Sequence, residues 1–258
     1  MTKSAEWFIY LLVCIEFTEV VDLKKFKQYL TLFPIYLLII CVIILLAVGG
    51  GEVVTVMSEN TKIDRRKTIV IDAGHGGVDG GATSCTGVLE SQYNLEIATC
   101  LNDLMQFIGY NTIMIRDGDY SVYTKGETIA QKKVSDLKER VRIVNSADCA
   151  LLVSIHQNHF PQAQYCGAQV FYAPTEGSEK VARTLQNAFT QTINIGSNRK
   201  IKKADSIYLM QHIRCAGILI ECGFISNPTE AYFLAERTYQ QNLCSVIACV
   251  ISEALNDT

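Results

Sequence analysis

Several familiar signatures are missing from this chain of 258 residues. It contains no CxxC pair, which is the spacing of a structural zinc ribbon, and neither GxGxxG nor GKS/GKT, the glycine-rich motifs that hold phosphate groups. Its 23 basic and 26 acidic residues give a formal net charge of −3, which leaves no electrostatic footprint for nucleic acid. We therefore expect neither a nucleic-acid-binding nor a nucleotide-binding protein.

Charged residues are also absent from residues 28–51. The apolar stretch in this range is long enough to cross about 30 Å of hydrocarbon as a helix. A cleaved signal peptide would have a shorter apolar region nearer the start, and a buried helix that is apolar all round needs a larger protein around it. We therefore predict four parts: an N-terminal segment at 1–27, a transmembrane anchor at 28–51, a juxtamembrane tether at 52–66 and a large domain at 67–258.

The charges that flank the predicted anchor indicate its orientation. Lys24, Lys25 and Lys27 precede it, and Glu52 and Glu59 are the first charged residues after it. Because basic residues favour the cytoplasmic side, we expect a single-pass membrane protein whose large domain lies outside the cytoplasm.

Eight of the ten cysteines follow the predicted anchor. An even number outside the cytoplasm is typical of disulfides, but a domain of this size does not need cross-links, and most of these cysteines lie in apolar runs as small core residues do. We expect free, buried thiols.

Beyond residue 67, short apolar runs alternate with segments of helical length. The predicted strands are 68–72, 111–115, 149–155, 167–172 and 217–222. The predicted helices are 90–108, 134–146, 176–193 and 228–255. This alternation predicts an α/β fold with an open, mostly parallel sheet and helices on both faces, preceded by one N-terminal transmembrane helix.

Functional residues are expected where parallel strands end, because loops leave the sheet there. His75 lies three residues after the first predicted strand, among glycines that let a bulky ligand come close. A phosphate-binding loop is the alternative, but a histidine in mid-loop does not help to hold phosphate. We interpret His75 as a metal ligand and Asp79 as a residue that orients either its imidazole or the loop.

Two further ligand candidates follow along the chain. Glu90 opens a predicted helix, where it is either a ligand or an ordinary first-turn glutamate favoured by the helix dipole. His156 follows the predicted strand 149–155. A single histidine there is usually an ordinary polar residue, but Asn158 and His159 accompany it. His159 either reaches the same metal or contacts substrate, and we favour substrate contact for it.

Glu221 lies near the end of an otherwise apolar strand. Burying a carboxylate without a partner is costly, so Glu221 must face a charge, a hydrogen-bond network or a cleft. It is either a general base facing metal-bound water or one half of a buried salt bridge with Arg140 or Arg116. Arg140 is also a candidate for a supporting contact in the site.

Two histidines and two glutamates are the residue types of a catalytic zinc site. Zinc lowers the pKa of bound water to about 7 and polarises a scissile carbonyl. Glu221 would take the proton of the water and return it to the leaving nitrogen. The reaction that we expect is amide hydrolysis.

The motifs DAGHGGVDGGA, ESQYNLEIA, SIHQN and IECGFISNPTEA resemble, in order and spacing, the zinc-dependent N-acetylmuramoyl-L-alanine amidases (type 3) of the bacterial cell wall. The resemblance covers residues 67–255. It implies that 67–258 is an amidase catalytic domain with one Zn²⁺ held by His75, Glu90 and His156, and with Glu221 as the catalytic glutamate. The implied substrate is peptidoglycan, cut between N-acetylmuramic acid and L-alanine.

The segment YCGAQVFY, the stretch NRKIKKADSIYLMQH and the predicted anchor resemble the sporulation- and germination-specific branch. That branch implies an enzyme on the outer, cortex-facing side of a bacterial cell membrane, with products that become muramic δ-lactam. His159 departs from the small residue common at its position. The need for an activating protein partner is left open.

Two rival functions are distinguishable by experiment. A paired-carboxylate glycosidase using Glu90 and Glu221 would survive a chelator and create reducing ends. A membrane-anchored peptidoglycan-binding module without activity would tolerate Glu221→Gln.

Overall fold

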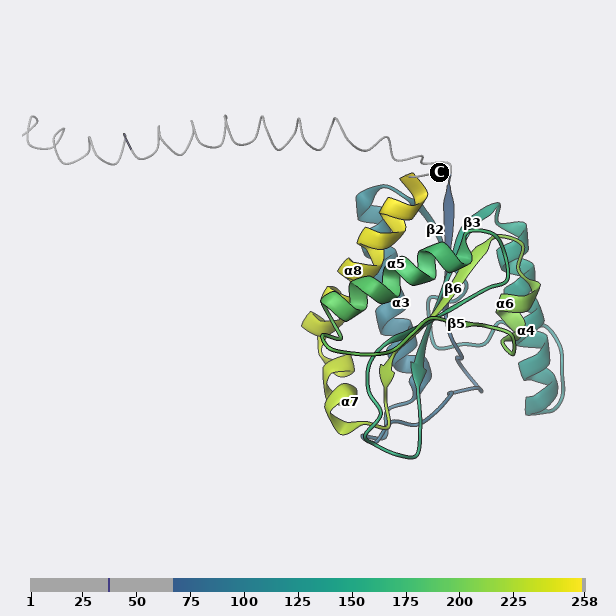
Figure 1. Ribbon diagram of the computed structural model, residues 1–258. Coiled ribbons are helices and arrows are strands. Elements are labelled where there is room, and N and C mark those ends of the chain that lie inside the picture. The colour runs from purple at the N-terminus through teal and green to yellow at the C-terminus, as the bar shows by residue number, and fades with distance from the viewer. Residues whose placement is uncertain (1–36, 38–66, 257–258) are drawn as a thin grey trace, which may run out of the picture. The chain divides into compact units, whose positions relative to one another are not determined.

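The computed structural model describes Leu37 and residues 67–256 (Figure 1). The predicted N-terminal segment at 1–27, the predicted anchor at 28–51 apart from Leu37, and the predicted tether at 52–66 lie outside the described residues. Among the residues that are described, no helix has both the length and the apolar character needed to cross a membrane. The anchor stays a prediction.

Six strands form one sheet in the order β2-β1-β3-β6-β4-β5. Their bounds are β1 (Thr68–Ala73), β2 (Asn111–Met114), β3 (Cys149–Asn158), β4 (Gln169–Tyr172), β5 (Lys202–Lys203) and β6 (Ala216–Phe224). Neighbours among β2, β1, β3 and β6 run parallel, whereas β4 runs antiparallel to β6, and β5 runs parallel to β4. The predicted parallel arrangement therefore holds for four strands within a mixed sheet.

The reversal at β4 follows from the connection that precedes it. The chain between β3 and β4 contains no helix, and a parallel return would need a crossover of about a dozen residues or more. The chain therefore reverses direction after β3, and β4 runs antiparallel to β6.

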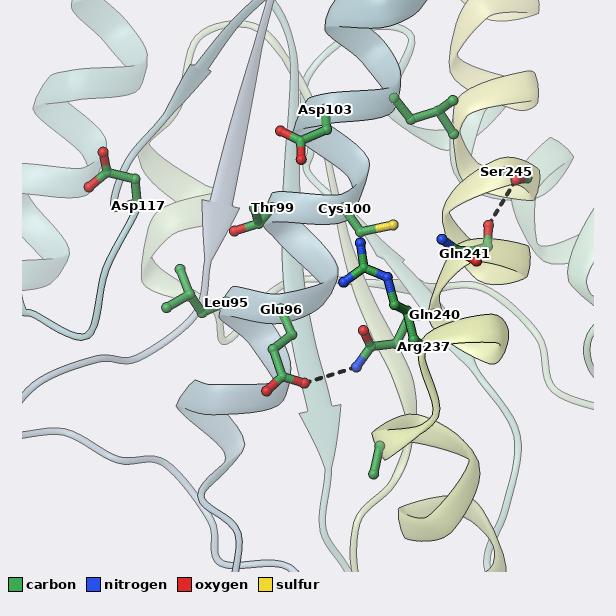
Figure 2. A pocket seen from close by; sticks show the side chains of 12 residues that line it. Leu95, Glu96, Thr99, Cys100, Asp103, Asp117, Arg237, Gln240, Gln241 and Ser245 are labelled. Carbon is green, nitrogen blue, oxygen red and sulfur yellow. Dashed lines mark hydrogen bonds between the residues drawn. The ribbon is translucent and has the colours of Figure 1, made fainter.

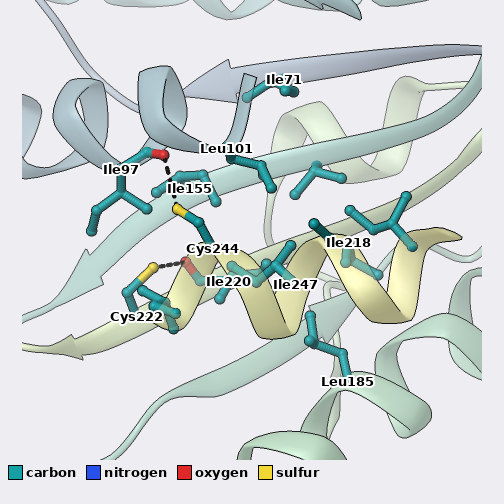
Figure 3. Packing of buried hydrophobic residues seen from close by; sticks show 14 of the residues in the cluster. Ile71, Ile97, Leu101, Ile155, Leu185, Ile218, Ile220, Cys222, Cys244 and Ile247 are labelled. Carbon is teal, nitrogen blue, oxygen red and sulfur yellow. Dashed lines mark hydrogen bonds between the residues drawn. The ribbon is translucent and has the colours of Figure 1, made fainter. Parts of the chain in front are cut away.

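Helices cover both faces of the sheet (Figure 1). One layer consists of α3 (Glu90–Ile108), α5 (Ser178–Gln191), α7 (Pro228–Ala235) and α8 (Arg237–Asn256), and the other of α4 (Ile129–Ser146) and α6 (Tyr208–His212). Under the first layer, Leu101 and Ile247 pack with Ile155 and Ile218 of the sheet (Figure 3). Because both faces are covered, the central strands are apolar on both sides.

Some helix boundaries differ from the prediction for identifiable reasons. Helix α4 begins at Ile129 rather than 134, because Thr128 and Gln131 form a capping box. The single helix predicted over 228–255 is divided at Glu236, which has extended backbone. The short elements β5 and α6 were not predicted.

The eight cysteines in the described part of the chain are free, as expected. Their burial was predicted less well. Cys222 and Cys244 are buried, whereas Cys85, Cys166 and Cys249 are exposed. Cys249 lies in an apolar run of α8 whose buried residues are its neighbours Ala248 and Val250.

Candidate metal centre

The loop after β1 carries His75 in a strained but fixed conformation. His75 has a positive φ of 60°, which is uncommon for a residue other than glycine. The preceding residue, Gly74, donates its N–H to the carbonyl of Ile155 at 3.0 Å, and its carbonyl accepts hydrogen bonds from Asn94 and Arg116. The backbone at the base of the loop is therefore held from three directions.

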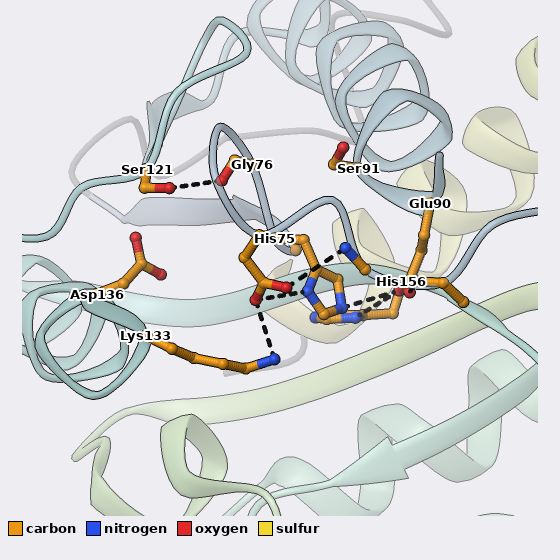
Figure 4. Close-up of polar contacts among 12 residues, drawn as sticks. His75, Gly76, Glu90, Ser91, Ser121, Lys133, Asp136 and His156 are labelled. Carbon is orange, nitrogen blue, oxygen red and sulfur yellow. Dashed lines mark hydrogen bonds and ion pairs between the residues drawn. The ribbon is translucent and has the colours of Figure 1, made fainter. Parts of the chain in front are cut away.

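Three side chains from separate elements meet beyond the carboxyl ends of β1 and β3 (Figure 4). Glu90 Oε1 lies 3.3 Å from His75 Nε2 and 3.0 Å from His156 Nδ1. The two imidazole centroids are 5.0 Å apart. One ligand atom from each residue lies within 4.8 Å of the others. The structure thus brings together the three residues that the sequence nominated as metal ligands.

The spacing of these atoms suits a zinc ion. Ligand atoms about 2.0–2.1 Å from a tetrahedral Zn²⁺ are roughly 3.4 Å apart. The distances of 3.0 and 3.3 Å between Glu90 Oε1 and the two nitrogens are close to that value. Two imidazole nitrogens and one carboxylate oxygen are also a donor set that zinc accepts at catalytic sites.

Glu90 is the first residue of α3 and is almost fully buried. Its Oε2 accepts the N–H of Ala82 at 3.0 Å, and its Oε1 accepts the N–H of Gln157 at 3.3 Å. Burial opposes the ionised form, but hydrogen bonds and charges from His156 and His75 outweigh it and lower the pKa of Glu90. Its carboxylate is therefore kept charged and aimed at the histidines, beyond what a first-turn position requires.

Asp79 contacts the imidazole of His75, the first of the two roles considered for it. Asp79 Oδ2 lies 3.0 Å from His75 Nδ1 and 3.1 Å from the Lys133 ammonium of α4 (Figure 4). Burial lowers the pKa of His75, but the hydrogen bonds to Asp79 and Glu90 raise it to about 9. Lys133 was missed by sequence reasoning, because a lysine on a polar helix face carries no local signal of this contact.

Glu221 stands opposite His156 in the register of β3 and β6. Its Oε2 is a buried oxygen for which the described part of the protein supplies no hydrogen-bond partner. Burial raises the pKa of Glu221 to about 6, with a further upward contribution from Glu90 and opposing ones from His156 and His75. This carboxylate lies close enough to His156, Glu90 and His75 to interact with their charges and has one oxygen uncommitted, as a general base requires.

The alternative of a salt bridge between Glu221 and Arg140 or Arg116 is wrong. Arg140 instead pairs with Asp72 and Asp136 and donates to the carbonyl of His75 at 2.7 Å. Arg140 therefore supports the site, although its contact is with the backbone of the loop.

Arg116 supports the same loop from inside the protein. It is fully buried and donates to the carbonyls of Ala73, Gly74 and Ser91 at 2.8–2.9 Å. Its position directly after an apolar strand was the only sequence signal of this role.

The two remaining candidates lie where β3 ends. Asn158 is the last residue of β3, and its carbonyl accepts the N–H of Ile225 at 2.9 Å. His159 is exposed and does not belong to the group of ligand atoms formed by His75, Glu90 and His156. The structure does not bring His159 to the metal position, and substrate contact by Asn158 or His159 stays a prediction.

A pocket lies between α3 and α8, away from the candidate ligands (Figure 2). It has a volume of about 810 Å³ and is lined by residues that include Glu96, Cys100, Arg237 and Gln240. None of the predicted site residues lines it.

Comparisons with known proteins agree with this site. The family model described as N-acetylmuramoyl-L-alanine amidase matches residues 69–253. The germination-specific N-acetylmuramoyl-L-alanine amidase of Bacillus subtilis (strain 168) is 38% identical over 183 residues, which cover 70% of this chain and 76% of that protein.

Solved structures give the same result. The CwlD amidase from Clostridioides difficile, solved in complex with the GerS lipoprotein, superposes with a TM-score of 0.71 at 35% identity, covering 74% of this chain and 100% of that one. An N-acetylmuramoyl-L-alanine amidase from Clostridium difficile 630 has a TM-score of 0.67 at 26% identity, covering 76% of this chain and 100% of that one.

The chain belongs to the N-acetylmuramoyl-L-alanine amidase family. Two expectations are confirmed: the cell-wall amidase family, drawn from four motifs, and the likeness to the germination-specific branch, drawn from segments such as YCGAQVFY and NRKIKKADSIYLMQH. The chain is thus an enzyme that hydrolyses an amide bond, and a binding module without activity is not supported.

Proposed function

We propose that this chain cleaves the bond between N-acetylmuramic acid and L-alanine in peptidoglycan with one Zn²⁺ held by His75, Glu90 and His156. The observation that carries this proposal is the convergence of one atom from each of these residues within 4.8 Å, next to the uncommitted Oε2 of Glu221. When bound, zinc supplies a Lewis acid that activates water and polarises the scissile carbonyl.

The residues of the chain have separate tasks in this mechanism. Glu221 Oε2 accepts the proton of the attacking water and returns it to the nitrogen of the departing L-alanine. A pKa of about 6 suits both steps at neutral pH, because the group is ionised yet retains appreciable proton affinity. Asp79 fixes the ring of His75 through Nδ1, so that Nε2 faces the metal.

A glycosidase mechanism is disfavoured by the surroundings of Glu90. Retaining and inverting glycosidases need one carboxyl group that donates a proton and one that attacks or activates water. Glu90 is held ionised between two imidazoles, so it is unsuited to donate a proton. Both of its oxygens are also engaged, Oε1 by the two rings and Oε2 by the N–H of Ala82, so neither is free to attack a sugar or to activate water.

The cellular role that we propose follows the germination-specific relative of Bacillus subtilis. The product chains would be converted to muramic δ-lactam in spore cortex. The predicted anchor at 28–51 would hold the enzyme at the bacterial cell membrane with the catalytic domain on the extracytoplasmic side. Since the CwlD amidase was solved with a lipoprotein, we also propose a protein partner for this chain.

The test is digestion of purified peptidoglycan by the full-length chain in detergent. We expect new amino groups of L-alanine, their loss with a chelator, and their return with added zinc. Glu221→Gln should abolish the release, whereas Glu96→Gln, an exposed glutamate of α3, should not. Chelator-resistant release of reducing ends would contradict the proposal. Zinc binding, measured separately, identifies an enzyme that is intact but needs its partner.

A further inference from the structure

Two cysteines that do not belong to the metal centre lie at the amino ends of β3 and β6, at the opposite end of these strands from His156 and Glu221. Cys149 is the first residue of β3, and Cys215 directly precedes β6. Their sulfur atoms are 3.0 Å apart, which is roughly 1 Å more than the S–S bond of a disulfide. Oxidation therefore has to bring the two sulfur atoms about 1 Å closer.

The backbone on both sides of this pair is held in place. Cys149 pairs with Thr68 in the ladder between β1 and β3. The side chain of Asn145, at the end of α4, accepts the N–H of Arg214 at 2.9 Å and donates to the carbonyl of His212 at 3.0 Å. The two sulfurs are therefore brought together by the fold rather than by chance mobility.

Both thiols are partly exposed, so a reagent is able to reach them. The hydrogen bond that they share lowers the pKa of Cys215 and raises that of Cys149, and the thiolate is the attacking species in disulfide exchange. Cys100 and Cys244 also share a hydrogen bond, but Cys244 is fully buried. Of these two pairs, Cys149 and Cys215 are the one in which the thiols are in contact and both are partly exposed.

We propose that Cys149 and Cys215 form a redox-active dithiol that closes to a disulfide on reaction with a small-molecule or protein disulfide. The Cys215 thiolate attacks one sulfur of that disulfide, forms a mixed disulfide and releases one thiol. Cys149 then loses its proton and attacks the sulfur of Cys215, which releases the second thiol. Two protein S–H bonds are exchanged for one S–S bond, and the two electrons and two protons reduce the external disulfide to two thiols.

The link would join β3 and β6 at their amino ends, whereas His156 and Glu221 lie toward their carboxyl ends. The linked residues are 66 positions apart, so closing the loop restricts the unfolded chain without touching the metal ligands. For a domain of this size we expect the oxidised form to melt roughly 5–15 °C higher. This inference is independent of the amidase mechanism.

The experiment uses the full-length chain in detergent. It is incubated with oxidised glutathione or with a reductant, alkylated and digested without reduction, and linked peptides are identified by mass spectrometry. We expect a Cys149–Cys215 linked peptide only after oxidation, together with the rise in Tm. Cys149→Ser and Cys215→Ser should lose the rise, whereas Cys249→Ser, an exposed cysteine of α8, should keep it.

Recovery of Cys149 and Cys215 as alkylated thiols after oxidation would overturn the proposal, and so would a link from either residue to another cysteine. A linked peptide without a rise in Tm would overturn the stabilising role. The linked peptide is sought in the unsubstituted protein, so a variant that fails to fold does not decide the outcome.

Discussion

Gly74 gives a sharp test of how the metal centre is built. A Cβ added at this position would lie 2.2 Å from Nε2 and 2.3 Å from Cε1 of His156. Ordinary van der Waals contact begins near 3.4 Å, so the imidazole of Gly74→Ala must retreat by at least about 1.2 Å. Metal sites tolerate errors of about 0.2 Å in ligand position.

The backbone of Gly74 is unable to absorb this displacement, because its N–H and its carbonyl are both hydrogen-bonded. We expect zinc affinity to fall at least about 100-fold, since even supporting residues around a metal cost 10–100-fold. Competition with a zinc-chelating dye measures the affinity, and circular dichroism checks that the fold persists.

The matched control is Gly87→Ala. A Cβ added at Gly87 meets no atom within 4 Å, although the positive φ of 87° adds a backbone strain that Gly74→Ala does not have; an unchanged zinc affinity in this control therefore isolates the collision. His156→Ala should lose as much affinity as Gly74→Ala, and the double variant should lose little more, because both act through the same imidazole. Wild-type zinc affinity in Gly74→Ala, or fully additive losses, would refute the reasoning.

Further predictions concern the general base Glu221, the contact of Lys133 with Asp79 and the protonation of His75. The rate of amide cleavage should fall tenfold per unit as pH drops below about 6, because Glu221 must be ionised to accept a proton and its pKa is raised only to about 6; a rate that stays flat to pH 4.5 would show that another group is the base. Lys133→Met should weaken zinc binding about two- to fivefold, because it removes a half-exposed ion pair with Asp79. Lys133→Arg should restore the affinity, and Lys132→Met should not change it. An unchanged zinc affinity in Lys133→Met would show that Lys133 does not support the metal centre through Asp79. In the zinc-free protein, protonated His75 stabilises the fold fully below pH 6.5, and this contribution of up to about 3 kcal/mol is lost as pH rises through about 9. Urea unfolding at pH 6.5 and 9.5 measures this loss of stability. Saturating zinc should remove the contribution of protonated His75, because His75 must be neutral to bind the metal. Equal stabilities at the two pH values without zinc would count against the contact between His75 and Asp79.

Much of the fold follows from local sequence. The apolar runs that became β1, β3 and β6 are bounded by polar motifs, so the end of the sheet at which His75, His156 and Glu221 gather was predictable. Strand length was not, because β3 continues through polar residues to Asn158, so that His156 lies inside the strand rather than after it. Asn227 and Pro228 start α7 as expected, with the Asn227 side chain accepting two backbone N–H groups.

Other features depend on contacts between distant segments, which local patterns do not encode. The reversed direction of β4 depends on the connection after β3, and β5 is too short to produce an alternating pattern. A salt bridge with Arg140 was one alternative for Glu221, yet Asp72 on β1 is the carboxylate that pairs with Arg140. The choice between buried carboxylates is decided by geometry.

The two ends of the described domain lie beside each other. Lys67 donates to the carbonyl of Leu255, and Tyr110 donates to that of Ser252 at 3.4 Å. Lys67, which directly precedes β1, therefore lies next to the last turn of α8, and β1 runs from there toward the loop of His75. Lys67 and the metal centre thus lie at opposite ends of β1, a separation of about 20 Å for a strand of six residues.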